Sequence, residues 1–275
     1  VVGYKENYQI KGVKQVIFKV ENNKEIGARA PRVGNSYAIG QVPSYKGDYI
    51  PVLMYHDFQE KITKKQQSEV VHPNLFEKQL KMLLEHGYTP INFNHLNLYM
   101  NGQGGLPLKP VIITVDDGYL SNYETAFPIL KKYNIPATFF VTTRYLGVET
   151  SFPHFTWEQA KEMEESGLID IQSHTHTHQL LNRIPDDEMR HEVTVSFGLI
   201  EQNLGRRDVK VLAYPQFYNN AHTRKILKEE GVELQITKLC KAHNSTPAPT
   251  NIQRIHVANY TNPQGLIREI KKLTR

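Results

Sequence analysis

Acidic and imidazole side chains follow several apolar segments of this 275-residue chain, and their types suit hydrolytic chemistry. Asp116 and Asp117 come directly after the apolar run 110–115. Two neighbouring carboxylates repel each other, so one of them is normally stabilised by a metal ion or a basic partner. An ordinary polar turn is the alternative, because Asp-Asp-Gly is a good turn sequence.

Three histidines lie within five residues after the apolar segment 168–173: His174, His176 and His178. Neutral imidazole is a favoured ligand of zinc and similar divalent ions. Two histidines and one carboxylate leave coordination positions open for water and substrate, which is typical of a catalytic site. So dense a group favours a metal site over surface histidines in a loop.

Other residues with chemical potential stand at the ends of further apolar segments. His56 follows the segment 49–55, Pro215 follows 209–214, and Arg254 lies inside the last segment. In a parallel barrel the carboxyl ends of all strands meet on one face, where the active site lies. The sequence therefore predicts that these distant residues converge.

Eight short apolar segments predict strands that are covered on both sides. The expected strands are 49–55, 88–93, 110–115, 137–142, 168–173, 209–214, 232–237 and 252–257. Alternation of strands and helices implies a parallel sheet, either a barrel or a doubly wound sheet. Around eight strands in about 225 residues favour an α/β fold of the (β/α) barrel type, distorted and with seven to eight strands.

Helix start signals stand between these strands. They predict helices that begin after Asn74, Thr156 and Asn220, at Asp186 or Asp187, and at Pro263. Glycines are expected to stop four of these helices. The four are Gly87, Gly167, Gly205 and Gly231.

Composition excludes several classes of protein. Hydrophobic residues make up 39% of the chain and charged residues 22%, as in an ordinary globular protein. A mean hydropathy of −0.50 and the lack of an 18-residue apolar run exclude a transmembrane helix. The single cysteine, Cys240, excludes an intramolecular disulfide and a multi-cysteine zinc site.

Residues 1–49 differ from the rest, and we expect them to form a β-rich or irregular lead segment before a domain of residues 50–275. Residues 1–50 carry eight Lys or Arg and four acidic residues, so most of the chain's net charge of +5 lies there. A basic arm suits a polyanionic partner such as wall polymers or an anionic membrane. Nucleic acid is disfavoured because no recognition signature is present. The alternative is an ordinary solvated surface.

The motifs resemble those of a known family. TVDDGY (114–119) followed by SHTHTH (173–178) is similar to the first two motifs of the polysaccharide deacetylases, the NodB-homology domain of carbohydrate esterase family four. VLMYHDF (52–58) and AYP (213–215) agree with this pattern. The leading segment most resembles the branch that contains the poly-N-acetylglucosamine deacetylases.

The resemblance implies a metal centre and a catalytic base. Asp117, His174 and His178 would be the ligands of a divalent metal, zinc before cobalt, nickel or manganese. Asp116 would be the general base.

It also implies roles for five further residues. His56 would be the general acid, and Arg254 would keep the base ionised. Pro215 would mark the third motif, and Gln216 would offer its backbone N–H to the oxyanion. The family pattern has an aromatic residue and then glycine after this proline, but here Gln216 and Phe217 stand there. We expect Phe217 or Tyr218 to replace the lost aromatic wall of the substrate groove.

The expected function is the hydrolysis of N-acetyl groups from N-acetylglucosamine residues of a cell-wall or extracellular polysaccharide. Peptidoglycan, poly-N-acetylglucosamine and chitin-like oligomers are the expected substrates. A secreted or surface-bound protein of a Gram-positive bacterium is the expected setting. Two alternatives stand beside it: a carbohydrate-binding relative without activity, and a glycoside hydrolase, which would need two carboxylates about 5–10 Å apart around a sugar bond.

Overall fold

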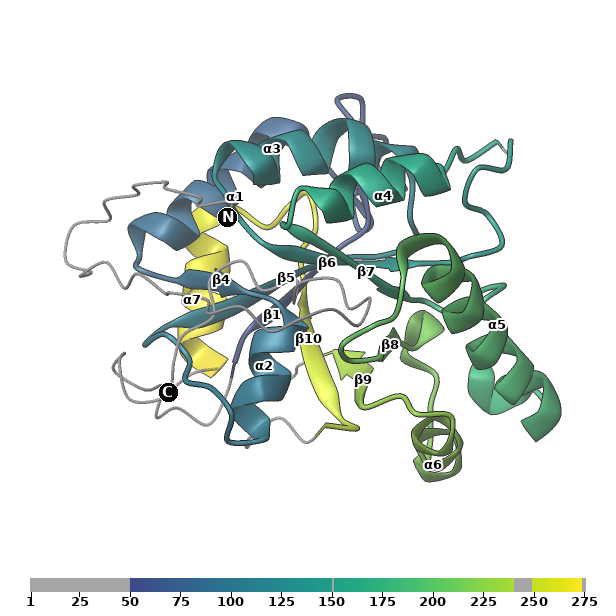
Figure 1. The fold of residues 1–275 in the computed structure, drawn as a ribbon. Helices are drawn as coiled ribbons and strands as arrows, with labels where there is room; N and C mark the ends of the chain where they lie inside the picture. Colours follow the sequence, from purple (N-terminus) through teal and green to yellow (C-terminus); the bar gives the residue numbers. More distant parts are fainter. Residues whose placement is uncertain (1–49, 150, 240–248, 274–275) are drawn as a thin grey trace, which may run out of the picture. The chain divides into compact units, whose positions relative to one another are not determined.

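The computed structural model describes residues 50–149, 151–239 and 249–273. Helices surround a central ring of strands in this part of the chain (Figure 1). The expected lead segment of residues 1–49 and the single Cys240 lie outside the described residues.

Seven parallel strands of the described residues close into a barrel in the order β1-β10-β9-β8-β7-β6-β5, and β5 pairs back with β1. An eighth strand, β4, pairs with the first residues of β5, before β6 pairs with its last ones. Their bounds are β1 Val52–Tyr55, β4 Thr89–Ile91, β5 Pro110–Val115, β6 Ala137–Val141, β7 Ile169–Ser173, β8 Val211–Ala213, β9 Leu234–Leu239 and β10 Ile252–His256. A short parallel pair joins β2 (Asp57–Phe58) to β3 (Val70–Val71). The predicted distorted (β/α) barrel and its eight strand positions are confirmed.

Helices cover the outside of the barrel. They are α1 Pro73–Glu85, α3 Phe127–Lys132, α4 Trp157–Glu165, α5 Asp186–Leu204, α6 Ala221–Glu229 and α7 Pro263–Leu273. A further helix, α2 Phe93–Met100, packs against the residues that fill the barrel interior. Shorter turns are a π-helix at Asn122–Ala126 and 3₁₀ turns at Leu181–Arg183 and Pro215–Phe217. The predicted caps Thr156 and Asn220 are confirmed, as are the starts of α5 at Asp186 and of α7 at Pro263.

One predicted helix start needs correction, and two α-helices were not predicted. The first helix begins at Pro73, not after Asn74, because the ring nitrogen of His72 accepts the N–H of Asn74 and the fixed φ of proline suits the first turn. Helix α2 was not predicted. Its capping box uses Asn92 with His95 in place of the usual Glu or Gln, and it shortens the strand expected at 88–93. Helix α3 and the π-helix before it were not predicted either.

Side chains alternate between the two sides of the barrel wall. One set of alternate strand residues packs with Phe93 and Leu96 of α2 and fills the interior. This set includes Val52, Ile112, Phe140, Val211, Ala213, Ile236 and Ile252. The opposite set, with Leu53, Ile113, Phe139 and Ile255, packs against the outer helices. On the same side of the wall, His56 and Asp116 lie four residues beyond Val52 and Ile112, and Arg254 and His256 lie two and four residues beyond Ile252. His174 lies two residues beyond the buried Gln172 of β7.

Candidate active site

A buried ion pair lies at the centre of the carboxyl end of the barrel. Both guanidinium NH2 groups of Arg254 donate to Asp116, one to each carboxylate oxygen, at 2.6 Å. Arg254 also donates to the hydroxyl of Thr114. Burial by itself raises the pKa of Asp116, but the charge and hydrogen bonds of the Arg254 guanidinium bring it down to about 2. Asp116 is therefore held as a buried carboxylate.

Two aromatic rings lie beside this arginine. The guanidinium carbon of Arg254 is 5.6 Å from the ring centroid of Phe140 and 5.5 Å from that of Phe217. Phe217 has φ of 61° and Gln216 has φ of 49°, so both adopt the left-handed conformation that favours glycine. This explains why the family pattern has glycine at position 217. The structure places Phe217 over the arginine, and its role in a substrate groove stays a prediction.

Three donor atoms converge next to the ion pair. Oδ1 of Asp117 is 3.5 Å from Nε2 of His174 and 3.6 Å from Nε2 of His178. Asp117 and Gly118 have φ of 73° and 85°, and this turn brings Asp117 back toward the interior set. The conformation of Gly118 favours glycine, and a Cβ there would lie 3.2 Å from the side chain of Leu146, which would have to move slightly.

The chemistry of these donors fits a divalent metal ion. Nδ1 of His174 donates to the carbonyl of Ala213 at 2.7 Å, which leaves Nε2 with its lone pair toward Asp117. Burial lowers the pKa of His174, so the ring is held in the neutral form that binds metals. Ligand atoms around tetrahedral zinc lie about 3.3 Å apart, close to the separations seen here. Asp117, His174 and His178 are the residues that would hold the ion.

The third histidine of the group has another environment. Nδ1 of His176 lies 3.0 Å from the hydroxyl of Thr143. The backbone N–H groups of His176 and Thr177 both donate to Glu192 of α5. Glu192, which is buried, therefore fixes the turn that carries His174 and His178. Sequence reasoning missed it, because an acid in the middle of a long helix carries no local signal.

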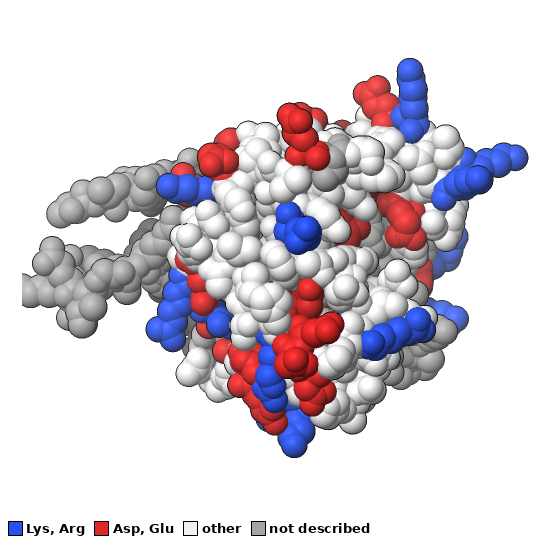
Figure 2. Space-filling view, turned by 90° about the vertical axis from the view of Figure 1, so that its right-hand side faces the viewer, with Lys and Arg blue, Asp and Glu red and all other residues white. Residues whose placement is uncertain are grey.

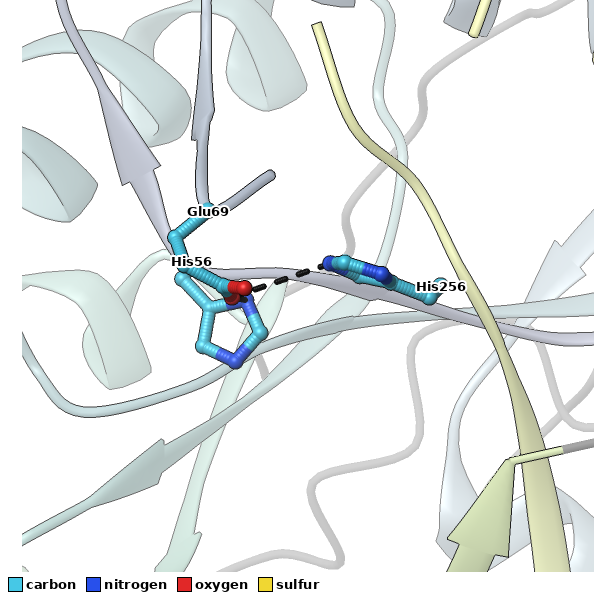
Figure 3. A group of neighbouring side chains, drawn as sticks. All are labelled: His56, Glu69 and His256. Carbon is cyan, nitrogen blue, oxygen red and sulfur yellow. Dashed lines mark ion pairs between the residues drawn. The ribbon is translucent and has the colours of Figure 1, made fainter. Parts of the chain in front are cut away.

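His56 lies between two carboxylates, that of Asp116 in the ion pair and that of Glu69. Its Nε2 is 3.9 Å from Oδ2 of Asp116, and its Nδ1 is 3.1 Å from Oε2 of Glu69. The same glutamate oxygen is 3.6 Å from Nε2 of His256 (Figure 3). Glu69 and His256 were not among the predicted residues. His256 could have been predicted as a site residue, because it lies two residues after Arg254 on the same strand. Glu69 could not, because it precedes a strand of only two residues, which the sequence does not mark.

The remaining predicted residues lie on the turn after β8. Pro215 is buried and Gln216 is exposed, two and three residues beyond Ala213, whose carbonyl orients His174. This places the turn on the same end of the barrel as the metal-binding group. The expected role of the Gln216 N–H stays a prediction.

The fold and the candidate site together define a class of protein: a distorted parallel (β/α) barrel with an Asp-His-His group of candidate metal ligands beside a buried Asp–Arg pair. Residues 103–234 match the family model of polysaccharide deacetylases, so this part of the chain belongs to that family and the resemblance seen in the motifs is confirmed. Members of this family are hydrolases that act on amide bonds.

Known proteins support the same placement. The YxkH protein of Bacillus subtilis is 32% identical over 192 residues, which are 68% of this chain and 64% of the relative. The poly-β-1,6-N-acetyl-D-glucosamine N-deacetylase of Staphylococcus epidermidis is 30% identical over 195 residues, 67% of this chain and 66% of the relative. The chain thus spans slightly less than two thirds of the length of each.

Among solved structures, the Streptococcus pyogenes deacetylase PplD in complex with acetate superposes with a TM-score of 0.73 at 25% identity. The match covers 84% of this chain and all of the other. No helix among residues 50–149, 151–239 and 249–273 has the length and hydropathy needed to cross a membrane.

Proposed function

We propose that this protein removes N-acetyl groups from N-acetylglucosamine residues of a polysaccharide and releases acetate. The observation that carries the proposal is the meeting of a buried, ionised Asp116 with the Asp117, His174 and His178 donors, with His56 3.9 Å from the same carboxylate. The names of the staphylococcal relative and of the streptococcal neighbour, a poly-N-acetylglucosamine deacetylase and a deacetylase, support it.

A divalent ion, zinc first, would supply acidity to a bound water and polarise the acetyl carbonyl when held by the three donors. Asp116 accepts a proton from the attacking water, and Arg254 keeps this carboxylate in place. The backbone N–H of Gln216 stabilises the oxyanion that forms on the former carbonyl oxygen. His56 protonates the leaving nitrogen as the C–N bond breaks. One water and one acetamide thereby give one acetate and one free amine.

The geometry favours this reaction over the alternatives. Glycoside hydrolysis needs two carboxylates on either side of a sugar bond. Here the two carboxylates are sequence neighbours, and each is already engaged: Asp116 with Arg254, and Asp117 with the two histidines. A binding protein without activity would have no need of a buried ion pair that holds a base at the metal-binding group.

Acetate release is the direct test. The full chain is incubated with zinc and with N-acetylglucosamine oligomers, poly-N-acetylglucosamine or peptidoglycan, and acetate and new reducing ends are measured in parallel. We expect acetate without new reducing ends. Reducing ends without acetate would establish a glycoside hydrolase, and binding of the oligomers with neither product would establish the binding protein.

We propose further that the protein works outside the cytoplasm, where polymers of this kind are found. Figure 2 shows acidic and basic side chains interspersed on one face of the described part. The basic excess lies in residues 1–50, and we propose that this basic arm tethers the protein to anionic wall polymers by electrostatic attraction. Binding of the full chain and of residues 50–275 to isolated cell walls is compared across a salt series. Equal binding by the two chains would contradict a tether made by this arm, and it would leave the deacetylase proposal in place.

A further inference from the structure

A second set of possible metal ligands lies beside the first. His56 follows β1, Glu69 precedes β3, and His256 ends β10 (Figure 3). Each offers one ligand atom, and the three atoms lie within 4.8 Å of one another. The two groups share no residue. His56 of the second group also lies beside the Asp116–Arg254 ion pair, since its Nε2 is 3.9 Å from Asp116 while its Nδ1 is 3.1 Å from Glu69.

We propose that His56, Glu69 and His256 form a second zinc site, and that zinc bound there takes His56 out of the reaction. Two histidines and one glutamate, with a fourth position left for water, are a recurrent ligand set for zinc. With bonds of about 2.0–2.1 Å, tetrahedral zinc separates its ligand atoms by about 3.3 Å. The separations here, 3.1 Å and 3.6 Å, lie on either side of that value.

The imidazole nitrogens of this group lack other partners. Nδ1 of His56 and Nε2 of His256 are buried, and neither has a hydrogen bond of acceptable geometry among the described residues, although both lie within ion-pair distance of Glu69. A buried polar atom without a partner is unfavourable. A cation between the two rings and the carboxylate would satisfy all three groups at once.

The backbone sets this arrangement in advance. Parallel strands β1 and β10 are in register with Met54 opposite His256, so His56 lies on the same face two residues further along. The carbonyl of Glu69 accepts the N–H of Asp57, and the N–H of Glu69 donates to Gln66. These bonds hold the main chain on either side of the site.

The second site should be weaker than the first. The Glu69 side chain is 54% exposed, so fixing it around an ion costs conformational entropy. In the first group His174 is buried and already oriented by the carbonyl of Ala213. Zinc therefore fills the Asp117 group first and the His56 group only in excess.

Occupation has a consequence that rests on the proposed function. An imidazole donates a proton as an acid only when both ring nitrogens carry hydrogen. Zinc on Nδ1 of His56 takes the place of one of these hydrogens, so the ring can no longer supply the proton that the leaving amine needs. Excess zinc is then an inhibitor that acts through the general acid.

The test counts zinc ions on the full chain by equilibrium dialysis with elemental analysis, over a range of zinc concentrations. Wild type should bind two equivalents, the second at least about tenfold more weakly, and Glu69→Gln and His256→Gln should each bind one. His176→Gln is the matched control and should still bind two. A single equivalent in wild type, or two in both Glu69→Gln and His256→Gln, would overturn the proposal.

Acetate release measured in the same samples separates the site from the function. Activity of wild type should fall as the second equivalent binds, and activity of His256→Gln should be insensitive to the same excess. A wild type that keeps full activity with two equivalents bound would overturn the inhibitory role of the site. Two equivalents on a protein without any deacetylase activity would support the zinc site and contradict the proposed function.

Discussion

Arg254 and Asp116 are joined by two hydrogen bonds of 2.6 Å across the end of β1, since β10 and β5 lie on either side of that strand. Both side chains are almost fully buried. Removal of one partner from such a pair leaves an uncompensated charge in the interior, which is more costly than removal of both.

The pair makes a prediction for stability. Arg254→Met should lower the free energy of unfolding by about 3–5 kcal/mol, because the Asp116 carboxylate loses its counter-charge. Adding Asp116→Asn should recover part of this loss, since the buried charge is then gone. Denaturant unfolding of the two single variants and the double variant measures the coupling. Strict additivity of the two changes would show that the pair contributes nothing as a pair.

The metal-binding group makes a second prediction. Asp117→Ala, His174→Ala and His178→Ala should each lose the tightly bound ion and nearly all acetate release, and a chelator should do the same to wild type. His176→Ala is the control and should keep the ion, because its ring lies against Thr143 and not in the group. Elemental analysis of the dialysed proteins decides, and unchanged metal content in the first three variants would contradict the assignment.

The acid and the base are tested separately from the metal. Asp116→Asn should bind the ion and lose about 10²–10⁴-fold in acetate release, and His56→Ala should lose a similar factor, as expected for general base and general acid groups. Metal content is measured on the same samples. Substantial activity in Asp116→Asn would remove this residue from the role of base.

Glu192 makes a fourth prediction, because it holds the backbone between the two ligating histidines. Glu192→Ala should weaken metal binding by about 10–100-fold, as is usual when a group that orients ligands is lost. Glu188→Ala, which removes an exposed acid one turn earlier on α5, is the matched control and should bind the ion like wild type. Equal affinities of the two variants would show that the turn keeps its shape without Glu192.

The sequence was sufficient for the barrel and for most of the site. Apolar runs of five or six residues mark buried parallel strands, and polar residues directly after such runs must lie at the carboxyl end. Asp116, Asp117, His174 and His178 were found in this way, and the structure brings all four together. Local signals also sufficed for α4 and α6, where Thr156 and Asn220 form the expected caps.

The tertiary structure decided what depends on pairing between distant segments. Glu69 reaches His56 and His256 because β2 and β3 pair, and Glu192 reaches the histidine turn because α5 packs on β7. Neither acid is marked by its neighbours in sequence, since a carboxylate on a loop or helix reads as a solvated surface residue. Strand periodicity determines which side of the barrel wall a residue faces. Arg254 meets Asp116, however, only because the ring of strands closes and places β10 and β5 on either side of β1.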